Sequence, residues 1–219
     1  MTFIEVLCEG SSDVPAIGEI LRRRFELSAE THFRIHAHRG KGKLPKNVKK
    51  RPLAKHDGLL DLLPAKLRAY GRAESEQYKI LVVVLVDADD DDCRELKRSL
   101  REMYAALEHK PQDVLFRIAV EETESWFLAD PKAVRAAFPG ADVAALRRIA
   151  PDTVCGAWER LARALGEDPH QCSGADKARW AGAIAQHLEL TAPKSPSLRA
   201  LVDGLEQRLR RPMTVGPSQ

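Results

Sequence analysis

The sequence predicts an α/β protein with a mostly parallel, four-stranded sheet, and three observations indicate this fold class. Apolar, β-branched runs alternate with stretches of helical periodicity over roughly the first 120 residues. Residues 80–86 (ILVVVLV) are apolar throughout, as is typical of a strand buried on both faces of a parallel sheet. The segments between the runs are long enough for the helical crossovers that parallel neighbours require. We therefore expect helices flanking the sheet.

The first strand is expected over residues 2–8 and ends at Glu9-Gly10. Ser11 or Ser12 can cap the helix that follows, and Pro15 is tolerated in its first turn. The apolar side chains of this helix share one face. They are Val14, Ile17, Ile20, Leu21 and Phe25. The chain therefore begins with a strand and an amphipathic helix.

Two more pairs of strand and helix follow, and then a last strand. Residues 33–38 predict the second strand, and residues 57–70 predict a helix with leucines along one side. The third strand, residues 80–86, leads into an amphipathic helix over residues 92–107. Residues 114–120 supply the fourth strand. Strands and helices thus alternate in the order of a doubly wound sheet.

The second half of the chain is expected to be helical, with no strand beyond Glu121. Helices are predicted at 124–129, 132–138, 155–165, 175–188 and 197–210, separated by Pro and Gly. We expect residues 1–130 to form the α/β domain and residues 131–211 to form a C-terminal helical extension packed on it. Residues 212–219 are expected to be a disordered tail.

The composition is that of a folded globular protein, with 44% hydrophobic and 31% charged residues among 219. The four cysteines, Cys8, Cys93, Cys155 and Cys172, form no CxxC pair, so neither a zinc site nor a disulfide framework is expected. The longest apolar run is far too short to cross a bilayer. We therefore expect a cytoplasmic protein with no membrane partner.

Charge is unevenly distributed along the chain, although the net charge is only +3. Residues 39–51 (RGKGKLPKNVKKR) contain seven basic residues and no acid. Such a stretch is suited to contacts with the phosphates of nucleic acid, which position a backbone without reading its sequence. The candidate binding residues are Arg39, Lys41, Lys43, Lys46, Lys49, Lys50 and Arg51.

Acidic residues follow three of the four predicted strands. Glu9 ends the first strand with Asp13 one turn later, Asp87 and Asp89 follow the third, and residues 121–124 (EETE) follow the fourth. Ligands of open α/β sheets collect at the carboxyl ends of the strands. Because converging carboxylates need a cation between them, and Mg²⁺ prefers oxygen ligands, we expect an Mg²⁺ site there, with Mn²⁺ as the alternative metal.

These residues resemble the Toprim pattern of topoisomerases, primases and OLD-type nucleases. The spacing in EGSSD, residues 9–13, looks more like the OLD-type nucleases. The sequence is still more similar to a bacterial Toprim-like family known only as a domain of unknown function, often encoded beside ABC- or SMC-type ATPases. That resemblance spans nearly the whole chain. Its motifs are EGSSD, RGKGKLP (39–45), LVDADDDDC (85–93) and EETESWFLAD (121–130), with weaker echoes at Lys177 and in SPS (195–197).

The resemblance implies roles for individual residues. Glu9 would be a metal ligand or general acid-base, and the other metal ligands would be Asp13, Asp87, Asp89, Glu122 and Glu124. Lys177 would contact a phosphate or the transition state, so the candidate catalytic residues are Glu9, Asp87, Asp89 and Lys177. The sequence departs from the Toprim form DxDxxG, because Asp90, Asp91, Asp92 and Cys93 stand where that form has its glycine.

Simpler structural interpretations compete at several positions. Residues 90–92 precede a helix and can be caps that complement its dipole. Trp126 is better explained by core packing than by base stacking. His36 and His38 face the same side of a strand and are not assigned to the site. No GxSxG-like signature and no complete P-loop pattern is present.

The sequence therefore predicts a Mg²⁺-dependent nuclease that acts on DNA or RNA, with DNA favoured, and whose basic stretch holds the strand. The resemblance places it in bacterial defence or genome maintenance with an ATPase partner. Two alternatives stay open. One is a catalytically silent, metal- and nucleic-acid-binding regulatory subunit of an ATPase complex, and the other is a phosphatase- or receiver-like protein that acts on small phosphates.

Overall fold

The sheet has four strands, all parallel, in the order β2-β1-β3-β4. The computed structural model describes residues 2–49, 57–89, 91–147, 149–153 and 155–210. The strands are β1 (Thr2–Cys8), β2 (Phe33–Ala37), β3 (Lys79–Asp87) and β4 (Asp113–Ala119). The predicted α/β fold class is confirmed, and the sheet is parallel throughout. Its carboxyl-terminal edge gathers the loops after β1, β3 and β4.

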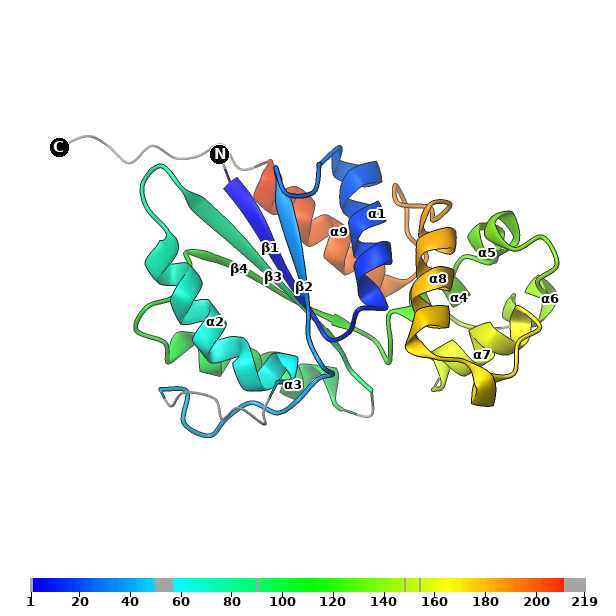
Figure 1. Ribbon diagram of the computed structural model, residues 1–219, viewed down its shortest axis with the longest axis horizontal. Coiled ribbons are helices and arrows are strands. Elements are labelled where there is room, and N and C mark those ends of the chain that lie inside the picture. The colour runs from blue at the N-terminus through cyan, green and yellow to red at the C-terminus, as the bar shows by residue number, and fades with distance from the viewer. Residues whose placement is uncertain (1, 50–56, 90, 148, 154, 211–219) are drawn as a thin grey trace.

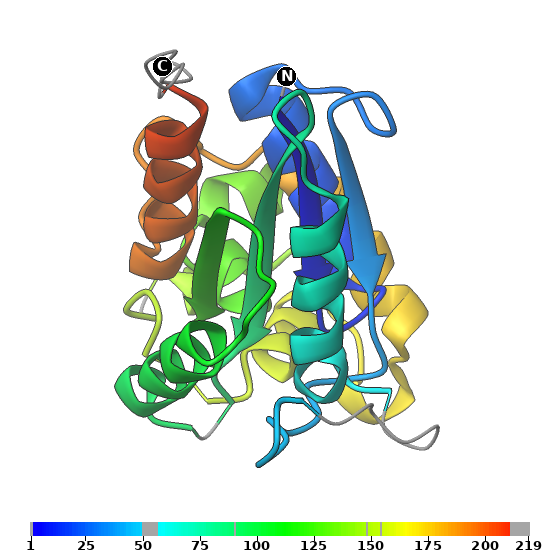
Figure 2. The ribbon, with the colours of Figure 1, turned by 90° about the vertical axis from the view of Figure 1, so that its left-hand side faces the viewer.

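Helices cover both faces of the sheet (Figures 1 and 2). One core lies between the sheet and α1 (Asp13–Phe25), and a second lies between the sheet and α2 (Leu59–Ala73) with α3 (Cys93–Ala105). Alternate residues of β3 serve the two cores, since Val83 belongs to the first and Val84 to the second. The uninterrupted apolar run of β3 is thus explained by burial on both faces.

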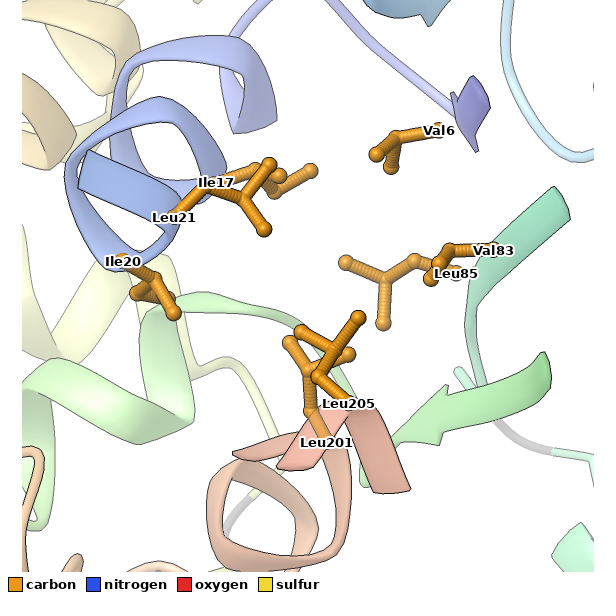
Figure 3. A pocket seen from close by; sticks show the side chains of 8 residues that line it. All are labelled: Val6, Ile17, Ile20, Leu21, Val83, Leu85, Leu201 and Leu205. Atoms are coloured by element: carbon orange, nitrogen blue, oxygen red, sulfur yellow. The ribbon is translucent and has the colours of Figure 1, made fainter. Parts of the chain in front are cut away.

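The last helix, α9 (Pro196–Leu209), returns to the sheet and packs against β4 on the face that α1 also covers (Figure 1). Apolar side chains from α1, α9 and the sheet meet around a cavity of about 10 Å³ (Figure 3). This volume corresponds to one water molecule at most. The junction is therefore packed core and not a ligand site.

The helices between β4 and α9 gather at the end of the molecule opposite α2 (Figure 1). They are α4 (Glu124–Leu128), α5 (Pro131–Ala137), α6 (Val143–Leu146), α7 (Ala157–Ala164) and α8 (Gly174–Ala185). The four-residue α6 and the 3-10 helix η1 (Pro169–Gln171) were not predicted, because such short elements show no periodicity. The division of the chain at residue 130 remains a prediction.

Two further expectations concern the C-terminal tail and membrane-spanning helices. The expected tail, residues 212–219, lies outside the described residues. Within the part of the chain that is described, no helix is both long and apolar enough to cross a membrane.

Candidate active site

Five acidic side chains meet at the carboxyl-terminal edge of the sheet, and we call them the carboxylate centre. Two lie in the loops after β1 and β4, one is the last residue of β3, and two are the first residues of α1 and α4. Their residues are Glu9, Asp13, Asp87, Glu122 and Glu124. The pKa of Asp87 is raised well above its usual value, first by burial and then by the other four acids in turn. The sequence-predicted acids of three separate strands are therefore electrostatically coupled around Asp87.

Glu9 joins the ends of the two central strands. Its Oε1 atom accepts a hydrogen bond of 2.8 Å from the backbone N–H of Asp87. Burial raises the pKa of Glu9 to about 7, and the charges of Asp89 and Asp13 add to this rise. Glu9 is thus held at a fixed position while its charge is opposed by the surroundings.

Asp13 is fixed from two sides. Its Oδ2 atom accepts a hydrogen bond of 3.1 Å from the backbone N–H of Gly10, and its Oδ1 atom accepts one of 2.9 Å from the Thr123 hydroxyl. Only 5% of Asp13 is exposed, and burial raises its pKa. Thr123 was missed in the sequence, because a hydroxyl between two glutamates gives no signal of its own.

Lys177, on α8, is the cation of the carboxylate centre. Its Nζ atom lies 3.3 Å from Glu124 Oε1 and 3.7 Å from Glu122 Oε1. It also lies 5.3 Å from the centre of the Trp158 ring, and the backbone N–H of Trp158 donates to Glu122 Oε2 at 3.2 Å. Burial opposes the charge of Lys177, but Glu124 and Glu122 prevail and raise its pKa.

Burial and the neighbouring Glu124 raise the pKa of Glu122 to about 7, in spite of Lys177. Glu124 is buried, with 4% exposed, and burial raises its pKa as well. The ammonium group of Lys177 therefore does not offset the five acids of the carboxylate centre. Full ionisation of the carboxylate centre is thus disfavoured unless a further cation binds there.

Asp89 pairs with the basic stretch. Its backbone has a left-handed φ of 47°, and its exposed carboxylate lies 3.2 Å from Lys41 Nζ. The same ammonium group lies 2.6 Å from the carboxylate of Asp91 and donates to the Ala88 carbonyl at 2.9 Å. Asp89 is close enough to raise the pKa of Glu9. It therefore borders the carboxylate centre and faces the basic stretch.

Two neighbouring acids have structural roles instead. Asp92 accepts hydrogen bonds from the backbone N–H groups of Arg94 (2.7 Å) and Glu95 (3.2 Å), so the prediction that it caps a helix is confirmed. Glu121 accepts from the backbone N–H groups of Gly156 and Ala157 at the start of α7. Asp90 lies outside the described residues.

The basic stretch does not gather as a unit at the carboxylate centre. Lys41 and Lys43 line a cleft of about 530 Å³ that Asp89 and the first turn of α3 also line. Arg39 is 86% exposed and lies 3.4 Å from Asp57, and Lys46 is exposed. Lys49 pairs with Glu108, beyond the far end of α3, at 2.6 Å. Lys50 and Arg51 lie outside the described residues.

The weaker motif, SPS at residues 195–197, has a structural explanation. Ser195 accepts from the backbone N–H of Leu198 at 3.1 Å and donates to Asp152 at 2.8 Å, so it caps α9. The hydroxyl of Ser197 accepts from Trp126 Nε1 at 2.9 Å. Trp126 is 1% exposed, which confirms that it is core.

The two strand histidines also lie apart from the five acids. His36 Nε2 lies 2.5 Å from Glu5 Oε2, and His38 Nδ1 lies 2.8 Å from the Cys8 carbonyl oxygen. Both contacts lie among β1 and β2, and neither involves a residue of the carboxylate centre.

The donor set suits a hard divalent cation, because the carboxylate centre offers only oxygen ligands and is short of positive charge. Within the described residues, however, no three His, Cys, Asp or Glu side chains are grouped closely enough to hold a metal ion as they stand. The residues therefore fit Mg²⁺ in chemistry and charge. Bringing their oxygens to ligand distance requires side-chain rotation.

The fold and the site define an α/β protein with a carboxylate centre at the carboxyl-terminal edge of a parallel sheet. Residues 8–206 match the family model described as Domain of unknown function (DUF4276), and the chain belongs to this family.

The chain is similar to a solved structure of the C-terminal region of the OLD protein from Xanthomonas campestris pv. campestris, with 14% identity and a TM-score of 0.42. That match covers 94% of this chain and 95% of the other. No curated protein matches the sequence.

Proposed function

We propose that the protein is a Mg²⁺-dependent nuclease that hydrolyses phosphodiester bonds, on DNA rather than RNA. The observation that carries this proposal is the raised pKa of Asp87, caused by burial and by four other acids around it. Carboxyl groups with strongly perturbed pKa values cluster at functional sites, and a bound cation would relieve the repulsion among these five. Mg²⁺ bound by Glu9, Asp13, Asp87, Glu122 and Glu124 would supply positive charge at the phosphodiester that is cut.

The protein's own residues would prepare this chemistry. The hydrogen bond from Asp87 N–H orients Glu9, and those from Gly10 and Thr123 orient Asp13. Lys177 holds Glu122 and Glu124 in place and lies close enough to contribute charge toward a phosphate. Glu9 would accept or donate a proton, because its pKa is raised to about 7.

The cleft beside Asp89 would hold the nucleic acid. Lys43 and the other exposed cations of the basic stretch can contact phosphates directly. Lys41 forms ion pairs with Asp89 and Asp91. Its ammonium group would be free to contact a phosphate once these two carboxylates bind a metal ion instead. We propose Asp89 as a metal ligand and catalytic residue in that rearranged state.

The setting belongs to the same proposal. A nuclease of this type would serve bacterial defence or genome maintenance and would work with an ABC- or SMC-type ATPase that gates cutting. The resemblance of the four sequence motifs supports this setting.

A second candidate is a catalytically silent, metal- and nucleic-acid-binding regulatory subunit of an ATPase complex. One observation favours it: Lys177 already balances part of the charge of Glu122 and Glu124, and no three acids form a ready metal cage in the described residues. In that case nucleic-acid binding would survive the loss of Asp87 and Asp89.

A cleavage assay separates the two. Plasmid DNA, single-stranded DNA and RNA are each incubated with the protein in Mg²⁺, Mn²⁺ or EDTA, beside the variant Asp87→Ala plus Asp89→Ala. The nuclease proposal expects metal-dependent cutting that the variant loses. No cutting of any substrate by either protein, with equal nucleic-acid binding by both, would replace it with the regulatory subunit.

A further inference from the structure

A second cleft, on the helical side of the molecule, is lined by cations and, among the residues that the structure describes, by no acid. It lies between α5, α6 and the segment that precedes α9, and its volume is about 440 Å³. Its charged lining residues are Lys132, Arg135, Arg147 and Lys194. All four are exposed. We call it the α5–α6 cleft.

These cations have no carboxylate partner among the described residues, whereas several other surface arginines do. Arg22, Arg34 and Arg98, for example, each form an ion pair with a neighbouring glutamate. In the α5–α6 cleft, the only polar contact of the four is the hydrogen bond from Arg135 to the Ala141 carbonyl oxygen at 3.1 Å, within the residues described. Four unpaired positive charges around a concave surface focus a positive potential on it.

The position of the cleft indicates which anion it takes. Lys132 follows Glu124 by eight residues, so the two Cα atoms are at most about 29 Å apart. A nucleic-acid strand covers that span with about eight phosphates at 3.4 Å each. α5 and α6 lie at the end of the molecule opposite α2 and α3, with the carboxyl-terminal edge of the sheet between them (Figure 1).

We propose that the α5–α6 cleft binds backbone phosphates of the nucleic acid to one side of the carboxylate centre, while Lys43 and its neighbours contact phosphates on the other side. The cleft adds affinity and sets the direction of the strand without reading its sequence. The choice of ligand rests on the proposed nuclease function, because a repeating anion is the ligand that can reach both regions at once.

The test compares two variants that remove the same charge. The cleft variant is Lys132→Gln, Arg147→Gln and Lys194→Gln, which leaves Arg135 and its hydrogen bond intact. The control variant is Arg22→Gln, Arg34→Gln and Arg98→Gln, which removes three ion-paired surface arginines. The affinity for a DNA duplex of about 20 base pairs is measured by fluorescence anisotropy in EDTA at several salt concentrations.

The slope of log affinity against log salt concentration should be smaller in magnitude for the cleft variant by about 2 to 3. Three phosphate contacts are lost, and each reduces the slope by about 0.9. The control variant should keep the wild-type slope. Equal slopes for the two variants would overturn the inference. Binding of inorganic pyrophosphate is measured in parallel. Its loss in the cleft variant, with an unchanged slope for DNA, would also overturn the inference, in favour of a small phosphorylated ligand.

Binding is measured without cleavage, so the two proposals fail separately. If the cleft variant has a shallower salt slope but the wild type cuts no DNA, phosphate binding in the α5–α6 cleft is supported and the nuclease proposal is rejected. If the wild type shows metal-dependent cutting but the cleft and control variants have identical salt slopes, the nuclease proposal is supported and phosphate binding in the cleft is rejected.

Discussion

At Asp87, burial and four neighbouring carboxylates all oppose the ionised form. Asp92, five residues later, caps α3 with two hydrogen bonds to backbone N–H groups. The two aspartates belong to one acidic segment of the sequence, yet the surroundings disfavour the ionised form of Asp87 and favour that of Asp92. Substitutions at the two positions should therefore have opposite effects on stability.

Asp87→Asn should raise the free energy of unfolding of the metal-free protein by about 1 to 3 kcal/mol, because the amide removes the repulsion and keeps the shape. Urea denaturation in EDTA at neutral pH measures this change. The same variant should lose metal-dependent cleavage. Asp92→Ala is the matched control: it should be less stable than wild type and cleave normally. A less stable Asp87→Asn protein would contradict our account of the site.

Glu9 and Glu122 predict a pH dependence of stability in the metal-free protein. Their pKa values are about 7 in the folded state against 4.5 for the ordinary group. Between these values the folded protein binds more protons than the unfolded chain, so stability falls as pH rises from about 4.5 to about 7. Each group contributes on the order of 3 kcal/mol to this fall. Urea denaturation in EDTA at several pH values across this range should show the fall in the free energy of unfolding. The Glu9→Gln variant should show a smaller fall. A free energy of unfolding that increases with pH would contradict the raised pKa values.

Thr123 is predicted to be a positioning residue. Thr123→Val removes the hydroxyl that donates to Asp13 and keeps the volume, so cleavage should slow by about tenfold or more. Thr123→Ser should restore the rate, because it restores the hydroxyl. Initial rates with varied substrate should show the loss in kcat and an unchanged KM. Equal kcat for wild type and Thr123→Val would mean that Asp13 needs no such support.

At the scale of the element, α9 depends on its first residues. Ser195 caps the helix and binds Asp152, while Ser197 accepts from Trp126 in the core. Ser195→Ala should lower the free energy of unfolding by about 1 to 2 kcal/mol, since it removes a cap and leaves Asp152 without that donor. The kcat of cleavage should not change. A lower kcat in a Ser195→Ala protein that is as stable as the wild type would instead place residues 195–197 in the active site.

Most elements of the fold could be predicted, because their signals are local. The apolar run of β3 and the leucine spacing of α2 are properties of neighbouring residues, and both elements were found within three residues of their predicted bounds. The docking of α9 on the sheet beside β4 was not foreseen, since a helical pattern shows that a face is buried but not what buries it.

The candidate site was partly predictable for the same reason. Strand ends placed Glu9, Asp87 and the acids after β4 at one edge of the sheet. The pairing of Lys41 with Asp89, and of Lys49 with Glu108, joins residues 48 and 59 positions apart, and no local pattern encodes such contacts. The basic stretch therefore appeared as a single patch in the sequence but is divided between two regions of the surface.

At the scale of the whole molecule, the carboxylate centre lies between two groups of cations. The cleft of Lys41 and Lys43 borders α2 and α3, and the α5–α6 cleft lies at the helical end (Figure 1). This arrangement suits a long polyanion that crosses the strand ends. The proposed cleavage depends on one claim, which is that the carboxylate centre binds a divalent cation.

Calorimetric titration of Mn²⁺ and of Mg²⁺ into the wild type, Asp87→Asn and Asp92→Ala, without nucleic acid, tests that claim most directly. Our account predicts saturable binding to the wild type and to Asp92→Ala, and none to Asp87→Asn. Absence of binding to the wild type, or equal binding to Asp87→Asn, would contradict it.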